Sequence, residues 1–409
     1  MKLLFLAPRL PLPIDTGGKI RTYNILKQLA KNAEVTLLSF SFEMEDVERA
    51  LKLNSLGIKV YTIPMQEPSL FKKLLGVTLG LTPFSISKYK SIKMEQKLIN
   101  LIKENSFDAI HIDHLHMSQY IPQCQGLPCI IDEHNVEYKI LERYVSVEAF
   151  LHKKIIYMDQ AFKMKTFESN IIKSSTACLA CSAVDQQVLE NLCYQKVPIH
   201  VIPNGVDTDF FTPNKTNPLP LEDAIVFTGS MDWLPNDDAI TYFCSQILPF
   251  IWRKNPAIKF YVVGKSPSTS VQKLAEKDAR VIVTGRVEDV RPYVERSKVF
   301  IVPLRVGGGT RLKILEAMAM RKAVVSTSIG AEGIQYTDHQ NILIGDTPEI
   351  FANHVLTLIR DSHKTLRIGH AGRTLVCDQY DWNIVGTKLK TIYQEVGNVH
   401  KKQNHSSNY

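Results

Sequence analysis

Short apolar runs alternate with longer stretches of helical periodicity along the whole chain. Apolar runs bounded by Gly, Pro, Asn or Asp are typical of buried strands, and the stretches between them are typical of helices. Strands that alternate with helices form βαβ units and a parallel sheet, so the pattern predicts an α/β fold. The predicted strands are KLLFLA, EVTLLSF, IKVYTI, DAIHI, PCIID, TACLA and HVIP in the first half, and AIVFTG, KFYVVG, VIVTG, VFIVPL and KAVVST in the second.

The same pattern predicts two doubly wound, Rossmann-like domains in series. The 409 residues, of which 44% are hydrophobic, are too many for one small core. Pro and Asn cluster in PNGVDTDFFTPNKTNPLPLED, which places the joint there. We predict domains over residues 1–203 and 204–380, then an amphipathic helix over 381–396 and a disordered polar tail over 397–409. Two such domains facing a cleft would form a ligand site from the loops at the carboxyl ends of their strands.

The composition favours a cytoplasmic protein. Seven cysteines are scattered without the spacing of a disulfide framework or a zinc site. The pair Cys178 and Cys181 lies within the apolar stretch TACLACSA, which is typical of packed core thiols. The first apolar run is too short for a secretory signal, and no run of about 18 apolar residues could span a membrane.

The positive charge is concentrated in residues 51–103, which hold nine lysines and two glutamates, a balance of +7 within a net charge of +8. Apolar LLGVTLGLTPFSI lies among these lysines, and its glycines and proline exclude a membrane-spanning helix. A basic, apolar segment of this kind can lie on anionic lipid at the inner face of a membrane. The alternative is a solvated helical face with a buried loop. Nucleic acid is not expected as a partner, because no binding motif or aromatic stacking pattern accompanies the lysines.

Two glycine-containing loops follow predicted strands and open helices. Gly17 and Gly18 in the first loop allow a ligand to approach the backbone and the free amides of a helix N-terminus, although G-x-G-x-x-G is missing. Arg21 on the same helix is either a ligand-binding or a surface residue. The second loop, VPLRVGGGTRLKILEAMAM, includes the candidate donor-binding residues Gly308, Gly309, Thr310, Arg311, Lys313 and Glu316.

The charges after the second loop indicate a diphosphate site. Lys313 and Glu316 share one helical face, and Arg311 lies beside the exposed amides. Basic residues in the first turn of a helix oppose its dipole, so fold stability alone does not explain them. Two cations and a helix N-terminus can bind a diphosphate, while a carboxylate one turn further can accept hydrogen bonds from a ribose diol. The alternative is a surface pair between Lys313 and Glu316.

This second loop and its helix resemble the donor-binding helix of the family-4 retaining glycosyltransferases, whose pattern is E-x7-E followed by A-M-A. VIPNGVDTDFF is similar to the family's interdomain segment, and PCIIDEHNVE is similar to its strand ending in T-x-H. The terminal helix is similar to the one that crosses back to the first domain. The resemblance covers most of the chain and implies the GT-B fold, a nucleotide-diphosphate sugar as co-substrate without a further cofactor, and a glycan or lipid-linked acceptor.

The resemblance also implies roles for individual residues. Glu316 would bind the donor ribose, and His134 would approach the transferred sugar. Gly17 and Gly18 would lie beneath the diphosphate. From their charge and position, and not from the resemblance, we expect Arg311 and Lys313 to stabilise the leaving group. Base contacts from the main chain would come from around Gly264, Arg286 and Val287, and His111, His114 and His116 are expected to be packing residues.

Two departures from the family pattern concern the donor. The first glutamate of E-x7-E is replaced by Gly308, which removes a side chain that relatives direct at the sugar. The loop FTGSMDWLPNDD contains Gly229 and Ser230, which are further candidate donor-binding residues. In this loop relatives hold an arginine and a lysine where this chain has Ser230 and Pro235/Asn236. Arg311 and Lys313 could replace this lost pair, because they supply the same charge near the same phosphates.

No metal site is predicted, since no paired-acid D-x-D motif flanks a strand and the cations suffice to balance a diphosphate. A nucleotide-sugar epimerase with the same fold is one alternative, although the LEAMA and PNGVD segments argue against it. A non-catalytic sugar-nucleotide binding protein is another alternative, which the missing first glutamate suggests. The sequence does not select the nucleotide, the sugar or the acceptor.

Overall fold

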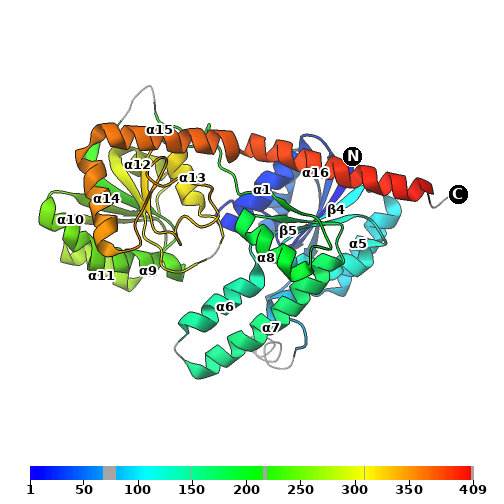
Figure 1. The fold of residues 1–409 in the computed structure, drawn as a ribbon. Coiled ribbons are helices and arrows are strands. Elements are labelled where there is room, and N and C mark those ends of the chain that lie inside the picture. The colour runs from blue at the N-terminus through cyan, green and yellow to red at the C-terminus, as the bar shows by residue number, and fades with distance from the viewer. Residues whose placement is uncertain (68–79, 149, 215–218, 308, 407–409) are drawn as a thin grey trace. The chain divides into compact units, whose positions relative to one another are not determined.

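The chain forms two compact units, which consist of Met1–Pro203 with Val385–Tyr409 and of Asn204–Ile384 (Figure 1). The computed structural model describes residues 1–67, 80–148, 150–214, 219–307 and 309–406. Each unit has its own parallel sheet and its own hydrophobic core. The predicted α/β fold with two Rossmann-like domains is therefore confirmed.

The first unit is built on a seven-stranded parallel sheet in the order β3-β2-β1-β4-β5-β6-β7. The strands are β1 (Lys2–Ala7), β2 (Glu34–Ser41), β3 (Lys59–Pro64), β4 (Ala109–Asp113), β5 (Cys129–Glu133), β6 (Ala177–Ala180) and β7 (Ile199–Val201). The helices are α1 (Gly17–Ala30), α2 (Asp46–Asn54), α4 (Phe84–Ser87), α5 (Ile92–Glu104), the 3-10 helix η1 (Leu115–Cys124), α6 (Glu137–Val147), α7 (Leu151–Lys173), α8 (Ala183–Cys193) and α16 (Trp382–Ser406). β1, β4 and β5 are neighbours, so the loops that follow them meet at one edge of the sheet.

The second unit is built on a six-stranded parallel sheet in the order β10-β9-β8-β11-β12-β13. The strands are β8 (Glu222–Thr228), β9 (Lys259–Val263), β10 (Val281–Gly285), β11 (Ser297–Val302), β12 (Ala323–Ser326) and β13 (Leu343–Ile344). The helices are α9 (Leu234–Tyr242), the π-helix η2 (Phe243–Ile247), α10 (Leu248–Lys254), α11 (Thr269–Lys277), α12 (Arg291–Arg296), α13 (Leu312–Ala319), α14 (Pro348–Arg360) and α15 (Ser362–Gln379). The loops after β8, β9, β10 and β11 lie along one sheet edge.

Each of the twelve predicted strands overlaps one of β1 to β12. The sequence pattern does not predict β13, because this strand has only two residues and leaves no periodicity. In both sheets the central strands are buried on both faces, because helices cover them. All five residues of β4, for example, are buried.

The last helix is longer than predicted. α16 extends to Ser406, so it includes most of the segment that the sequence predicts as a disordered tail over 397–409. That segment contains no proline, and its Lys and Gln residues are compatible with a helix, so the polar composition alone does not end α16. Within the first unit, Tyr393 of α16 is buried and its hydroxyl is hydrogen-bonded to His111 of β4.

Candidate active site

In the first unit, two aspartates hold one histidine at the ends of β4 and β5. His134 follows β5 directly, and its Nε2 lies 3.0 Å from Oδ1 of Asp113 and 3.4 Å from Oδ2 of Asp132. Asp113 and Asp132 are 1% and 0% exposed. Because β4 and β5 pair in parallel with Asp113 opposite Asp132, the two carboxylates converge on the imidazole.

The charge of His134 follows from this arrangement. Burial alone would lower the pKa of His134, but the carboxylates of Asp113 and Asp132 outweigh burial and raise it to about 9. The ring is therefore an imidazolium at neutral pH, with a proton on each nitrogen. Nε2 faces the aspartates, which leaves the Nδ1 proton for another acceptor.

His114 is a second imidazole at this site. Its Nδ1 lies 2.9 Å from Oδ2 of Asp113, and its ring centroid lies 3.5 Å from that of His134. The backbone of His114 has φ of 64°, a conformation that costs a residue with a β-carbon about 1–3 kcal/mol. Strain of this kind is concentrated at functional sites, so His114 is not an ordinary packing residue.

Gly18 brings α1 into contact with both imidazole rings. A β-carbon on Gly18 would lie 3.2 Å from Nε2 of His114 and 3.8 Å from Nδ1 of His134. The first contact is tighter than most real β-carbons make, so a side chain at position 18 would have to displace His114 slightly. Gly17 begins α1, and the side chain of Thr16 caps the helix by accepting a hydrogen bond from the amide of Lys19. The predicted glycine loop therefore lies against the predicted histidine.

Arg21 is not a surface residue, and its guanidinium faces away from solvent. It is 1% exposed and donates hydrogen bonds through Nε to Asp132, at 3.0 Å, and through Nη1 to the carbonyl of Ile202, at 2.9 Å. Burial excludes the surface alternative for Arg21, and the hydrogen bonds to Asp132 and Ile202 engage the guanidinium that the sequence analysis offers as a ligand-binding group. A buried cation is retained only with a charged partner, and Asp132 is that partner. Arg21 therefore supports His134 through Asp132.

The other histidines of the HIDHLHM segment pack against aromatic rings. His111 is completely buried and stacks on Phe5 with ring centroids 4.1 Å apart, and burial lowers its pKa to about 4. His116 is half-buried with its ring edge against Tyr89, at a centroid distance of 5.5 Å. The expected packing role is confirmed for these two residues.

Two groups of side chains in this cluster have ligand atoms close enough together for a cation. They are Asp113 with His114 and His134, and His111 with Asp113 and Asp132, and in each group the ligand atoms lie within 4.8 Å of one another. In the first group a metal would have to displace the proton that both aspartates hold on His134. In the second group the hydroxyl of Tyr393 binds Nδ1 of His111, while the buried Nε2 has no hydrogen-bond partner among the described residues. The chemistry of the first group therefore fits a hydrogen-bonded network better than a metal site.

In the second unit, Lys313 supplies a positive charge at the sheet edge where the loops after β8, β9, β10 and β11 lie. It lies on α13 and is half-buried, with its Nζ 2.9 Å from Oδ1 of Asn236 and 3.9 Å from the ring centroid of Phe227. Burial, with a contribution from the charge of Arg311, lowers the pKa of Lys313 to about 7. Burial also raises the pKa of Glu316, one turn further along α13, to about 7. Both groups can change charge near neutral pH, which is typical of functional sites.

Asn236 fixes the ammonium of Lys313. Its Oδ1 accepts the hydrogen bond from Lys313, and its Nδ2 donates one to the carbonyl of Ser230 at 2.7 Å. The side chain of Asn236 is 4% exposed, so water competes little for either of its hydrogen bonds. The hydroxyl of Ser230 is bonded to Asp232. The predicted donor-binding Ser230 therefore contributes its carbonyl to Asn236 and is linked to Lys313.

Two glycines pack the ends of β8 and β9 against each other. A β-carbon on Gly229 would lie 2.7 Å from Nζ of Lys313, and a β-carbon on Gly264 would collide with the carbonyl oxygen of Gly229. Both positions have a positive φ that L side chains rarely adopt. The predicted donor-binding residues Gly229 and Gly264 thus allow Lys313 to approach the backbone at the ends of these strands.

Arg311 and its neighbours form the start of α13. Arg311 is the N-cap residue, is 5% exposed, and has its guanidinium carbon 5.6 Å from the ring centroid of Trp233. Gly309 has φ of 73° and Thr310 is 9% exposed, with its hydroxyl directed at Gly333. Gly308 lies outside the described residues.

Arg286 and Val287 follow β10, whose C-terminal end is next to that of β9. Arg286 is exposed, while Val287 packs against the core of the second unit. They lie on the same sheet edge as Gly264, but no contact among the described residues joins them to Lys313.

The sequence analysis does not select Asp113, His114 and Asp132 of the first unit or Asn236 of the second. Asp113 and His114 stand at the end of a predicted strand, and Asp132 stands two residues before His134. The feature that could have identified these residues is their position at the carboxyl ends of adjacent parallel strands, where ligand sites form. The role of Asn236 depends on a contact with Lys313, 77 residues away, which the sequence pattern does not show.

Comparison with protein families gives two matches that together span most of the chain. Residues 16–210 match the model described as Glycosyltransferase Family 4, and residues 222–361 match the model described as Glycosyl transferases group 1. An uncharacterised 44.6 kDa protein in the cps region of Klebsiella pneumoniae is 21% identical over 394 residues, which cover 93% of this chain and 96% of that protein. A phosphatidyl-myo-inositol mannosyltransferase of Mycobacterium tuberculosis is 23% identical over 206 residues, 48% of this chain and 53% of that protein.

Solved structures with the same fold cover nearly the whole chain. HepE of Anabaena in complex with UDP and glucose has a TM-score of 0.63 at 15% identity, and covers 96% of this chain and 99% of that one. Sucrose-phosphate synthase of Thermosynechococcus elongatus has a TM-score of 0.69 at 15% identity, with 97% and 99% covered. At this identity the likeness concerns the fold.

Proposed function

Because the chain belongs to the family-4-type glycosyltransferases of the GT-B fold, we propose that it transfers a sugar from a nucleoside-diphosphate sugar, with retention of anomeric configuration and without a metal. The bond between the anomeric carbon and the β-phosphate oxygen breaks, and a bond to an acceptor oxygen forms. The nucleoside diphosphate leaves with the electron pair, and the acceptor hydroxyl proton passes to its phosphate.

The observation that carries this proposal is the position of Lys313. Its ammonium is held by Asn236 beside the end of β8 and on the first turn of α13. Helix N-termini and fixed cations stabilise phosphate oxygens, and their effect grows as charge develops on the leaving group. Arg311 adds a second positive charge at the same end of α13. Glu316, one turn further, would accept hydrogen bonds from the donor ribose.

The imidazolium of His134 suits a hydrogen-bond donor better than a base. Both of its nitrogens are protonated at neutral pH because Asp113 and Asp132 stabilise the charge. We assign its Nδ1 proton to a hydroxyl of the transferred sugar. Gly18 lies beside this nitrogen, since a β-carbon on Gly18 would be 3.8 Å from it.

The carboxylates near His134 favour retention without a covalent intermediate. Asp113 and Asp132 are both buried. Asp113 accepts a hydrogen bond from His134 and contacts His114, while Asp132 lies 3.4 Å from the same nitrogen of His134 and binds Arg21. A nucleophilic carboxylate must be able to reach the anomeric carbon, and these two are held away from solvent. Attack on the same face from which the diphosphate leaves therefore fits the described residues better than a double displacement.

The relatives suggest the class of acceptor. The mannosyltransferase of Mycobacterium tuberculosis acts, by its name, on phosphatidyl-myo-inositol, and the Klebsiella relative is encoded in a cps region. We propose a glycan or lipid-linked acceptor of polysaccharide or envelope synthesis, used on the cytoplasmic side of a membrane. The donor nucleotide is left open, since HepE, which binds UDP, is similar to this chain in fold alone.

Thermal unfolding with a panel of nucleoside-diphosphate sugars tests the donor proposal. A ligand that binds the folded state raises the melting temperature by mass action, so one nucleotide series should stand out and its shift should shrink in Lys313→Met. Donor incubated without acceptor distinguishes an epimerase, which would change the sugar, from a transferase, which would leave it intact or hydrolyse it slowly. Binding without transfer to any lipid-linked or glycan acceptor would instead indicate a non-catalytic binding protein.

A further inference from the structure

Helices α6 and α7 form an antiparallel hairpin that projects from the first unit (Figure 1). The outward side of α7 carries Leu151, Ile155, Met158 and Phe162, whose side chains are 71%, 57%, 56% and 74% exposed. Their spacing places all four within one narrow stripe of the helix. We call these four residues the apolar stripe.

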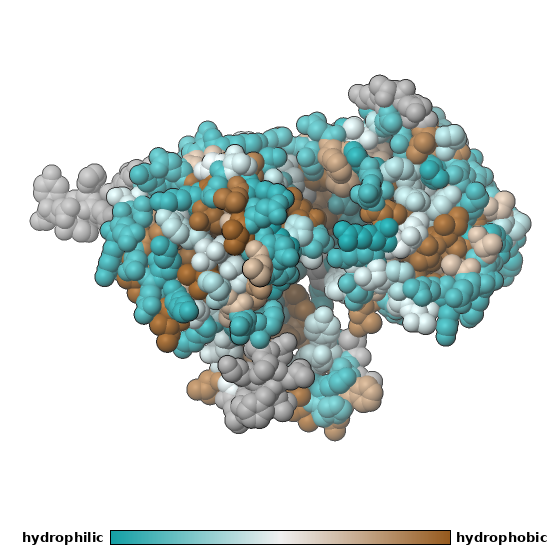
Figure 2. Space-filling view, turned by 180° about the vertical axis from the view of Figure 1, so that it is seen from behind, coloured by the Kyte–Doolittle hydropathy of each residue, from teal (hydrophilic) through white to brown (hydrophobic). Residues whose placement is uncertain are grey.

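The stripe is unusual because the opposite side of α7 is also apolar. Ala161, Met164 and Ile172 are buried against the first unit, so packing already uses that side. A surface helix normally carries polar residues on its outer face. Phe150, at the start of α7, and Tyr144, on α6, add two more large exposed apolar side chains, at 58% and 42%. Hydrophobic residues are visible at the end of the hairpin in Figure 2.

Cations flank the stripe. Lys154 and Lys165 lie on α7 beside it, and Lys153 is at the end of the hairpin. Among the described residues, no carboxylate forms an ion pair with these three lysines. Two other lysines of the hairpin are neutralised, since Lys139 pairs with Glu142 at 2.8 Å and Lys163 with Asp159 at 2.6 Å.

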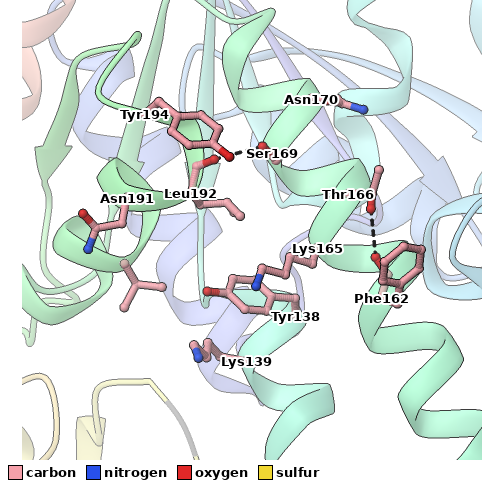
Figure 3. A pocket seen from close by; sticks show the side chains of 11 residues that line it. Tyr138, Lys139, Phe162, Lys165, Thr166, Ser169, Asn170, Asn191, Leu192 and Tyr194 are labelled. Atoms are coloured by element: carbon pink, nitrogen blue, oxygen red, sulfur yellow. Dashed lines mark hydrogen bonds between the residues drawn. The ribbon is translucent and has the colours of Figure 1, made fainter.

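The stripe leads into a groove of about 710 Å³ between α6, α7 and α8. The described residues that line it contain lysines, tyrosines and amides but no carboxylate: Tyr138, Lys139, Phe162, Lys165, Thr166, Ser169, Asn170, Val188, Asn191, Leu192 and Tyr194. Figure 3 shows Lys139 and Lys165 on either side of the ring of Tyr138, and their ammonium groups lie 5.1 and 5.3 Å from its centroid. Phe162 belongs to both the stripe and the groove.

We propose that the apolar stripe and the groove form a docking surface for an anionic phospholipid bilayer. The stripe would enter the boundary between headgroups and acyl chains, as amphipathic helices do at membrane interfaces. The unpaired lysines would meet lipid phosphates, and the groove would receive a headgroup. A second copy of the chain fits less well, because two such faces would bring the same lysines together. The helices of the described chain are too short or too polar to span the bilayer.

This surface is distinct from the segment 51–103 that the sequence predicts to lie on lipid. The central part of that segment, residues 68–79, lies outside the described residues. The proposal also stands independently of sugar transfer, since it concerns binding alone.

Flotation of the full chain with vesicles tests the proposal. Wild type should bind vesicles that contain phosphatidylglycerol, release them at high salt, and bind pure phosphatidylcholine weakly. Ile155→Glu with Phe162→Glu should abolish binding, while Leu366→Glu, at an exposed apolar position of α15, should not. Lys154→Gln with Lys165→Gln should weaken binding by about fivefold per lysine at low salt. Lys273→Gln, on the exposed side of α11, is the matched control.

Three results would overturn the proposal. Wild type could remain unbound at low salt, the hairpin variants could bind as well as wild type, or neutral and anionic vesicles could bind equally. A dimer that Ile155→Glu dissociates, without vesicle binding, would assign the stripe to a second copy. Phe162→Trp adds a measurement that does not depend on loss of binding, because its emission should shift to the blue with anionic vesicles and stay unchanged with neutral ones.

Discussion

The ammonium of Lys313 donates a hydrogen bond to the side-chain oxygen of Asn236 across 2.9 Å, and the same amide donates to the carbonyl of Ser230. Asn236 thereby gives Lys313 one fixed position without neutralising its charge. An aspartate at position 236 would neutralise the charge of Lys313, and an apolar residue there would leave the ammonium without this hydrogen-bond acceptor. The neutral amide thus keeps the cation available for a diphosphate.

Asn236→Asp should raise the pKa of Lys313 and weaken donor binding. The new carboxylate would stabilise the charged amine but repel the diphosphate, so the affinity for nucleoside diphosphate should fall by about tenfold or more. Asn236→Ala should lower the free energy of unfolding by about 1–3 kcal/mol, because it removes a hydrogen-bond partner from a buried cation.

Calorimetric titration and thermal unfolding measure these two effects. Asn341→Ala, which removes a half-buried amide elsewhere in the second unit, is the control for binding. Nucleotide affinity unchanged in Asn236→Asp would argue that Lys313 does not meet the phosphates.

At pH 8 the protein should take up a proton when it binds a nucleotide. Lys313 has a pKa of about 7 in the empty site, so at pH 8 it is mostly neutral, and a bound diphosphate favours its charged form. Affinity should therefore decrease as the pH rises from 7 to 9. Glu316, with a pKa of about 7, would instead release a proton below neutral pH, so pH 8 separates the two groups.

Calorimetric titrations in buffers with different ionisation enthalpies measure how many protons the protein takes up per nucleotide bound. Lys313→Met should abolish the uptake, whereas Lys322→Met, at another buried lysine of the same unit whose pKa is also lowered, should keep it. Equal uptake by wild type and Lys313→Met would assign the proton to another group.

The contribution of His134 to stability should disappear as the pH rises. Its pKa is raised in the folded state from an ordinary value of 6.5 to about 9. A folded state that binds the proton more tightly is stabilised fully below pH 6.5, and this stabilisation is lost as the pH rises through 9. The melting temperature of His134→Gln should therefore lie furthest below that of wild type at pH 6 and approach it at pH 9. A constant difference over this range would show that His134 is not charged.

Gly18→Ala should reduce activity without unfolding the first unit. The added methyl group would lie 3.2 Å from His114 and close to Nδ1 of His134, where we place the transferred sugar. Glycine and alanine are both compatible with this helical position, so the melting temperature should change little. Turnover with donor is the measurement, and Gly397→Ala, where a β-carbon meets only the side chain of Met1 at 3.5 Å, is the control. Full activity of Gly18→Ala would move the sugar away from this nitrogen.

The strands and the glycine loops could be predicted because they depend on local pattern. Apolar runs bounded by turn residues identified β1 to β12, and the loops with Gly18, Gly229 and Gly264 followed from the strand ends. The proximity of Lys313 and Glu316 also follows from helix geometry alone.

Contacts between distant residues could not be predicted in the same way. Arg21 has the sequence context of a surface residue, yet it is buried because Asp132, 111 residues away, neutralises it. Asp113 binds His134 only because β4 and β5 are neighbours in register. The exposed apolar stripe of α7 is indistinguishable from its buried side by periodicity, since both sides are apolar.

Lys313 is the residue on which the account of the chemistry depends most. As the glycosidic bond breaks, negative charge grows on the diphosphate, so a fixed ammonium should bind the transition state more tightly than the ground state. The loss of one such group costs about 3 kcal/mol, or roughly a hundredfold to a thousandfold in rate. The most direct measurement is the turnover number of Lys313→Met at saturating donor. The assay follows transfer of the sugar to an acceptor, or hydrolysis of the donor, with a chelator present throughout. The account predicts that wild type keeps its activity in the chelator and that Lys313→Met loses a hundredfold or more, with a smaller change in donor affinity. Near-wild-type turnover of Lys313→Met, or loss of wild-type activity in the chelator, would contradict it.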